Sequence, residues 1–160
     1  MILVTLGTQD KSFIRLLKEI DNQIKNGNIK DRVVAQIGFT QFSSKRMEIY
    51  DYFTMKEFNK YIKEADIVIT HGGVGSVLGA LDKNKKVIAF PRLAKYKEHI
   101  NDHQTQMVNT LAKEGYILTG RVSELSKLLE RVKTFKPRKY KSNNEKFNDL
   151  IIDYIENNKK

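Results

Sequence analysis

The sequence has 160 residues, of which 40% are apolar, and this suits one packed domain. It contains no cysteine, which excludes a disulfide framework and thiolate chemistry. The formal net charge of +10 favours an anionic partner, such as a phosphate-bearing ligand, an anionic membrane surface or nucleic acid. Its apolar runs fall short of the roughly 20 residues that a membrane span needs. The apolar start reaches Gly7 without a basic leader, so we expect a first strand there and not a signal peptide.

Segments typical of strands and of helices alternate along the chain. Strands are predicted over 1–6, 32–37, 47–53, 66–70, 87–90 and 116–119, and helices over 12–25, 54–64, 77–83, 102–114, 125–133 and 145–157. Ser12 is expected to cap the first helix, and Thr54 and Glu57 are expected to form a capping box. Short strands rich in Val and Ile that alternate with helices predict an α/β fold, a Rossmann-like parallel sheet with helices on both faces. We expect residues 1–160 to form a single domain.

A glycine-rich loop lies between the strand at 66–70 and the helix at 77–83, and it reads His71, Gly72, Gly73, Val74, Gly75, Ser76. Ligands of open parallel sheets bind beyond the carboxyl ends of the strands, and free amides at a helix N-terminus attract anions. Glycines let a phosphate approach the backbone, and the hydroxyl of Ser76 can donate to the same oxygens. The loop therefore predicts a diphosphate site. The alternatives are a tight turn without a ligand and, for His71, a hydrogen bond to the neighbouring backbone.

A polar loop follows the strand at 87–90 and leads into the next helix. It carries charged and amide side chains, namely Arg92, Lys95, Lys97, Glu98, His99, Asp102, His103 and Gln104. Carboxylates and amides are the groups that recognise sugar hydroxyls. The alternative is that Asn101 or Asp102 caps the helix and that the other side chains are solvated. A third loop, from Gly7 and Thr8 to Asp10, is expected to form the floor of the same crevice.

Together these segments resemble the C-terminal, donor-binding domain of glycosyltransferase family 28, which is one half of a GT-B enzyme. The resemblance rests on Leu6-Gly7-Thr8, on residues 66–76 and on residues 91–104, and it spans nearly the whole chain. Within the family, the chain resembles the small catalytic subunits of two-component glycosyltransferases, which include the N-acetylglucosaminyltransferase subunit of dolichol-linked oligosaccharide synthesis. It is more similar to the galactosyl- or glucuronosyltransferase subunits of bacterial exopolysaccharide and capsule biosynthesis than to that subunit.

The resemblance implies a UDP-sugar donor and an inverting transfer that needs neither a metal nor another cofactor. The diphosphate would lie at Gly72–Ser76, the sugar at Glu98, Asp102 and Gln104, and the uracil near Arg92. The full set of residues expected to bind the donor is Gly7, Thr8, His71, Gly72, Gly73, Val74, Gly75, Ser76, Arg92, Glu98, His99, Asp102, His103 and Gln104. His71 and Glu98 are the candidate catalytic residues. Many relatives carry a ribose-binding glutamate where this chain has Gly79, so Glu98 is also a candidate for that role.

A GT-B enzyme needs a second domain, so the resemblance implies a membrane-anchored partner subunit that binds a lipid-linked saccharide acceptor. The protein would then be cytoplasmic and peripheral at the inner face of the plasma membrane, with galactose or glucuronic acid as the sugar. The basic stretch 121–141 could face the partner or the anionic leaflet. The alternative function is a non-catalytic nucleotide-sugar-binding or assembly subunit. Nucleic acid is not expected as a partner, because the sequence lacks a basic and aromatic stacking platform.

Overall fold

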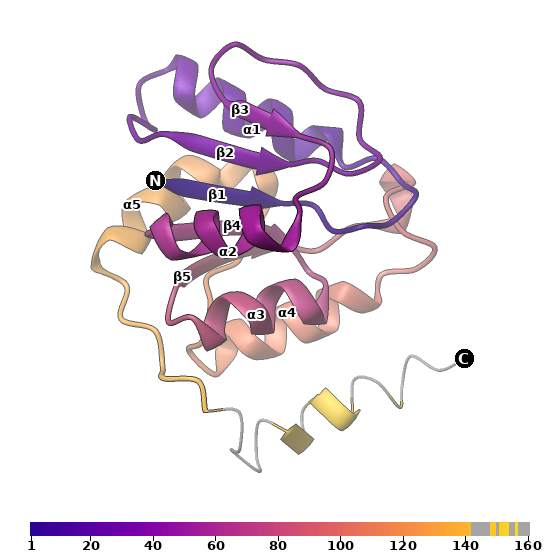
Figure 1. Cartoon of the computed structure of the whole chain (residues 1–160). Helices are drawn as coiled ribbons and strands as arrows, with labels where there is room; N and C mark the ends of the chain where they lie inside the picture. The colour runs from indigo at the N-terminus through magenta and orange to yellow at the C-terminus, as the bar shows by residue number, and fades with distance from the viewer. Residues whose placement is uncertain (142–147, 150, 154–155, 157–160) are drawn as a thin grey trace.

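Five short parallel strands form the centre of the computed structural model, which describes residues 1–141, 148–149, 151–153 and 156 (Figure 1). The strands are β1 (Ile2–Thr5), β2 (Val33–Gln36), β3 (Glu48–Tyr50), β4 (Ile67–His71) and β5 (Lys86–Phe90). Their order in the sheet is β3-β2-β1-β4-β5, and each neighbouring pair is parallel. The predicted α/β fold is confirmed. The strand order reverses between β1 and β4, and such a topological switch point is where open α/β sheets bind ligands.

Helices cover both faces of the sheet (Figure 1). On one face, α1 (Ile14–Lys25) and α5 (Leu125–Thr134) pack against a core that includes Val4 and Ile69. On the other face, α2 (Met55–Glu64), α3 (Val74–Asp82) and α4 (His103–Lys113) pack against a second core that includes Leu3 and Val68. Successive strand residues thus belong to opposite cores, as the two-residue period of a strand requires. Two single-turn 3-10 helices, η1 (Ala94–Tyr96) and η2 (Val122–Glu124), complete the described elements.

The two predicted helix caps have different outcomes. The capping box of α2 is confirmed, because Thr54 Oγ1 accepts from the Glu57 amide at 3.1 Å and Glu57 accepts from the Thr54 amide at 2.8 Å. The prediction of Ser12 as the cap of α1 is wrong. The helix begins at Ile14, and no side chain caps it. The buried Phe13 takes the preceding position, with its amide donating to Thr40 Oγ1 at 2.9 Å, so tertiary packing decides where α1 begins.

The predicted strand at 116–119 is also wrong, because only Leu118 forms a bridge, to Ile88 of β5. Leu118 exchanges two hydrogen bonds with the β5 backbone. The hydroxyl of Thr119 then donates to the Ala89 carbonyl at 2.7 Å, and the chain turns away into η2. Of the helix predicted over 145–157, residues 148–149, 151–153 and 156 are described and are helical, and the other residues lie outside the described part. Among the residues that are described, no helix is long and apolar enough to cross a bilayer.

Candidate functional site

The loops after β1 and β4 meet at the topological switch point, and the imidazole of His71 lies between them. A Cβ atom on Gly7 would lie 2.5 Å from His71 Nε2, and one on Gly73 would lie 2.2 Å from His71 Cε1. A Cβ atom on Gly72 would lie 2.7 Å from a methyl carbon of Val108 in α4. These three glycines therefore allow close packing of the histidine and of α4. Gly7 also has a φ of +76°, which favours glycine.

His71 is neutral and its ring orientation is fixed by two hydrogen bonds. Its Nδ1 accepts from the Gly73 amide at 3.1 Å, so the ring proton is on Nε2, which donates to Ser76 Oγ at 3.2 Å. Burial lowers the pKa of His71 to about 3, with smaller contributions from the charges of Arg92 and His99. The expected bond to the neighbouring backbone is thus present. Since Ser76 Oγ accepts from the imidazole, its own proton is available for another acceptor.

Helix α3 begins at Val74, three residues before the predicted start, so Val74, Gly75 and Ser76 form its first turn. No side chain caps this helix. The first amides of a helix have no acceptor within the helix, and the helix dipole adds a partial positive charge there. Gly75 is exposed, and a Cβ atom on it would have no neighbour within 4 Å. The first turn of α3 therefore presents backbone donors, and Gly75 leaves the approach to them open.

Glu98 is only 3% exposed, and both of its carboxylate oxygens are hydrogen bonded. One oxygen accepts from Arg15 Nε at 2.7 Å, and the other accepts from Arg15 Nη2 and from the Leu93 amide, both at 3.0 Å. No sequence pattern predicts that Arg15 and Glu98 form a pair, because the two residues are 83 positions apart. Sequence reasoning therefore missed Arg15.

Arg92 and Gln104 are also buried, at 1% and 3% exposure. The Arg92 guanidinium donates to the carbonyls of Leu6, Lys11 and Glu98, and burial lowers its pKa to about 10. The Arg92 amide donates to Gln104 Oε1 at 3.0 Å. The Arg92 side chain therefore connects the loops after β1 and β5 inside the protein, and Gln104 connects the loop after β5 to α4.

The rest of the predicted set lies nearer the surface. Asp102 is exposed and accepts from the Ala94 amide at 2.8 Å, whereas Asn101 accepts from the His103 amide at 3.0 Å at the start of α4. Asn101, and not Asp102, thus satisfies a first-turn donor. His99 is half-buried, and burial and the charge of Arg92 lower its pKa. Of the residues predicted to bind the donor, those that are at least partly accessible are Gly7, Thr8, Gly73, Val74, Gly75, Ser76, His99, Asp102 and His103.

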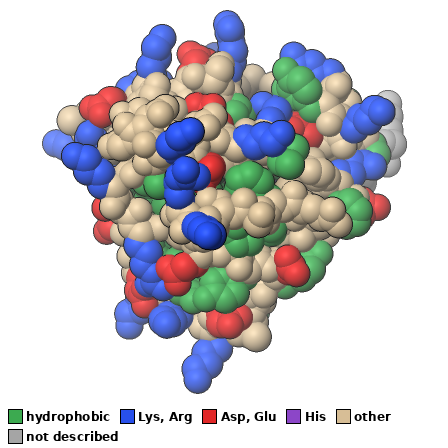
Figure 2. Space-filling model, turned by 90° about the horizontal axis from the view of Figure 1, so that it is seen from above, with side chains coloured by type: hydrophobic (Ala, Val, Ile, Leu, Met, Phe, Trp, Pro, Cys, Tyr) green, Lys and Arg blue, Asp and Glu red, His purple; other side chains and the backbone are tan. Residues whose placement is uncertain are grey.

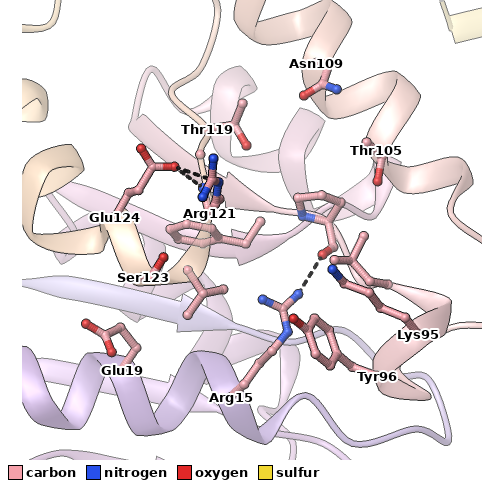
Figure 3. A pocket seen from close by; sticks show the side chains of 15 residues that line it. Arg15, Glu19, Lys95, Tyr96, Thr105, Asn109, Thr119, Arg121, Ser123 and Glu124 are labelled. Atoms are coloured by element: carbon pink, nitrogen blue, oxygen red, sulfur yellow. Dashed lines mark hydrogen bonds and ion pairs between the residues drawn. The ribbon is translucent and has the colours of Figure 1, made fainter.

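Two cavities flank the switch point at the carboxyl edge of the sheet. The larger, of about 610 Å³, lies beyond β5 between α1, α4 and residues 119–124, with Arg15, Tyr96 and Thr105 among its lining residues (Figure 3). The other, of about 530 Å³, lies beyond β2 and β3 and contains the exposed rings of Phe39 and Tyr52. Neither cavity was predicted from the sequence. Among the described residues there is no group of three acidic or histidine side chains that could hold a metal ion.

The strand order and the helices on both faces make this a Rossmann-like α/β domain, a fold that it shares with solved glycosyltransferase structures. The chain belongs to the glycosyltransferase family 28 C-terminal domain, whose profile matches residues 1–155. The family resemblance seen in the sequence is thereby confirmed.

Relatives in the family are named as subunits of one enzyme. The chain is 27% identical over 88 residues to the Candida albicans UDP-N-acetylglucosamine transferase subunit ALG13, a match over 55% of this chain and 29% of the relative. It is 29% identical over 123 residues to the human protein of the same name, a match over 72% of this chain and 10% of the relative. The chain thus spans less than a third of either relative.

Solved structures share the fold at low sequence identity. The solution structure of ALG13 matches with a TM-score of 0.62 and 19% identity, over 94% of each chain. The crystal structure of the kitacinnamycin glycotransferase matches with a TM-score of 0.58 and 13% identity, over 96% of this chain and 37% of that one. The second match covers about a third of a longer enzyme, as expected if this chain corresponds to one domain.

Proposed function

We propose that this chain is the donor-binding subunit of a two-component glycosyltransferase, and that it binds a UDP-sugar at the switch point between β1 and β4. The observation that carries the proposal is the uncapped first turn of α3, which presents backbone amides beside the exposed Gly75. Such an arrangement of donors stabilises an anionic group, and a diphosphate is the anionic group of a UDP-sugar.

In this proposal His71 orients Ser76 and is not itself a proton acceptor. The imidazole donates to Ser76 Oγ, so the serine hydroxyl is left to donate to a phosphate oxygen. The amides of the first turn and this hydroxyl stabilise the charge that develops on the departing UDP. His71 Nδ1 and both oxygens of Glu98 already accept hydrogen bonds. We therefore assign the general base that deprotonates the acceptor hydroxyl to the partner subunit.

The nucleotide base is assigned to the cavity that contains Phe39 and Tyr52. These rings are 59% and 55% exposed, and a Cβ atom on Gly38 in the same cavity wall would lie 2.8 Å from the Gly7 carbonyl oxygen. The cavity therefore adjoins the loop after β1, which is one of the two loops that meet at the switch point. Arg92, near which the uracil was first expected, is buried, so an aromatic ring is the better stacking surface.

The partner is proposed to be a membrane-anchored subunit that binds a lipid-linked saccharide, which would place this chain at the cytoplasmic face of a membrane. The names of the ALG13 relatives describe each of them as a subunit. The net charge of +10 would favour an anionic membrane surface. In the view of Figure 2, Lys and Arg side chains are dispersed among acidic and apolar ones, which fits general electrostatic attraction.

The transferred sugar is proposed to be a hexose, a hexuronic acid or an N-acetylhexosamine. The relatives' names point to N-acetylglucosamine, and the resemblance within the family points to galactose or glucuronic acid. The role in exopolysaccharide or capsule biosynthesis stays a prediction, and the relatives' names give it no support.

Calorimetric titration tests the donor site directly. The wild-type chain is titrated with UDP, UDP-N-acetylglucosamine, UDP-galactose, UDP-glucuronic acid and UDP-glucose, and Ser76→Ala is the matched variant. We expect one of the UDP-sugars to bind, and Ser76→Ala to weaken UDP binding by about tenfold through loss of one hydrogen bond to a charged group. No binding of UDP by the wild-type chain would overturn the proposal.

Transfer activity separates a catalytic subunit from a non-catalytic one. We expect the chain alone to be inactive on a lipid-linked saccharide and to gain activity when the partner subunit is added. Two results would instead favour the non-catalytic alternative. One is transfer activity of the partner without this chain, and the other is activity of the complex that Ser76→Ala leaves unchanged.

A further inference from the structure

The ion pair between Arg15 and Glu98 connects two parts of the molecule that are distant in sequence. Arg15 lies in the first turn of α1, and Glu98 lies in the loop between β5 and α4. The guanidinium makes two hydrogen bonds to the carboxylate, of 2.7 and 3.0 Å, and lies 3.4 Å from the Pro91 carbonyl oxygen. Figure 3 shows Arg15 beside Tyr96, whose ring centroid is 4.6 Å from the guanidinium carbon. A planar cation with several donors is suited to such a junction.

Glu98 also fixes the shape of its own loop. Besides Arg15 it accepts from the Leu93 amide at 3.0 Å, and Asp102 accepts from the Ala94 amide at 2.8 Å. Two successive amides at the start of the loop are thus held by carboxylates that lie at its end. Lys97, which directly precedes Glu98 in this loop, has a φ of +58°. The loop therefore forms a closed turn, and Arg15 attaches that turn to α1.

We infer that Arg15 and Glu98 are positioning residues, which hold the loop 93–102 so that Asp102 and His103 face a sugar bound beside the glycine loop. The inference rests on the proposed donor site. Asp102 and His103 lie where this turn joins the start of α4, and the next residue, Gln104, packs with Val108 against Gly72. A shift of the turn would move Asp102 and His103 relative to the glycine loop. The bound diphosphate would keep its own donors in α3.

An ion pair that serves only stability can be replaced by apolar side chains of similar size with little loss, or with a gain. The double variant Arg15→Met/Glu98→Leu makes this replacement. The variant removes the ion pair that attaches the turn to α1, and a leucine side chain at position 98 also cannot accept from the Leu93 amide, so the bond that closes the turn is lost as well. The apolar side chains keep about the volume of the pair. The single variant Glu98→Gln keeps the shape of residue 98 and loses the charge. Arg46→Met is the matched control, because it breaks another ion pair of α1, with Asp21, at 3.2 Å.

The experiment measures nucleotide affinity, thermal stability and amide hydrogen exchange for each variant. We expect the double variant to melt near the wild-type temperature and to exchange the Leu93 amide faster. Its dissociation constant for the UDP-sugar that binds the wild-type chain should rise roughly tenfold, whereas that for UDP stays within about twofold. Glu98→Gln should also speed exchange of the Leu93 amide and weaken binding of the UDP-sugar, and Arg46→Met should change neither of these two quantities.

Equal affinity of the wild-type chain and the double variant for the UDP-sugar would overturn the inference, and so would an equal loss for UDP and the UDP-sugar. If the wild-type chain binds neither nucleotide, the proposed function fails, and hydrogen exchange still tests the attachment. Unchanged exchange at Leu93 in the double variant would then show that the pair does not hold the turn.

Discussion

At the scale of single residues, His71 illustrates how packing decides the chemistry of a side chain. The ring fits between the backbones of Gly7 and Gly73, where a Cβ atom on either residue would lie within 2.5 Å of it. Burial in this position lowers the pKa of His71 to about 3 and keeps the ring neutral. A neutral ring with Nδ1 as acceptor has one tautomer, and this tautomer fixes Ser76.

The titration of His71 predicts a pH dependence of stability. Its pKa is about 3 in the folded protein, against 6.5 for an unperturbed histidine. Below pH 6.5 the unfolded chain therefore binds a proton that the folded chain does not, and the free energy of unfolding falls as the pH falls toward 3. We expect His71→Gln to remove a slope that approaches about 1.4 kcal/mol per pH unit. Urea denaturation of both proteins between about pH 7 and pH 5 measures it, and equal slopes would contradict the prediction.

At the scale of elements, α3 has glycines of two kinds. Gly73, at its N-terminus, allows contact with His71, whereas Cβ atoms on Gly75 and Gly79 would have no neighbour within 4 Å. Glycine lowers the stability of a helix by about 1 kcal/mol relative to alanine. Packing within the described residues therefore does not explain Gly75 in the first turn, whereas the proposed diphosphate site would explain it, because a ligand there needs close approach to the backbone.

Alanine substitutions in α3 test this distinction. Gly75→Ala and Gly79→Ala should each raise the free energy of unfolding by up to about 1 kcal/mol. Only Gly75→Ala should weaken UDP binding, because its methyl group would cover the first-turn amides. Gly79→Ala, one turn further along the same helix, is the control. Chemical denaturation and calorimetry measure both effects, and unchanged UDP binding by Gly75→Ala would count against the diphosphate site.

Gly73→Ala should instead lower the free energy of unfolding. The added Cβ would lie 2.2 Å from His71 Cε1, so the ring or the backbone must shift. Overpacking of this kind costs about 1–3 kcal/mol. A thermal melt of Gly73→Ala beside Gly75→Ala compares the two sites, and equal melting temperatures would contradict the packing described for His71.

At the scale of the whole molecule, the sheet order sets both stability and the place of the site. β1 and β4 are neighbours at the centre, and their residues Leu3, Val4 and Ile69 are fully buried. β3 is a three-residue strand at the edge that pairs only with β2 among the described strands. The most stable strands therefore hold the two loops that meet at the switch point.

This arrangement predicts the pattern of amide hydrogen exchange. Amides of β1 and β4 should exchange slowest, at the rate of global unfolding, and those of β3 should exchange fastest among the strands. Exchange followed by NMR spectroscopy measures every strand in one experiment. Equal protection of β3 and β1 would mean that the sheet opens as one unit.

The sequence by itself determined the fold class, the family and most elements, because these depend on local patterns. The alternation of apolar strands and helices, the capping box at Thr54 and the glycine loop are each contained within a short segment. Ser12 and residues 116–119 were predicted incorrectly. At these places, contacts of Phe13 with Thr40 and of Thr119 with Ala89 replace the local preference.

Only the tertiary structure decided which polar residues are available to a ligand. Glu98, Arg92 and Gln104 have the chemistry of ligand-binding groups in the sequence, and in the folded protein they are buried and bound to Arg15 and to backbone groups. Hydrogen-bonding capacity is a property of a residue type, whereas its use depends on partners that folding brings together from distant positions.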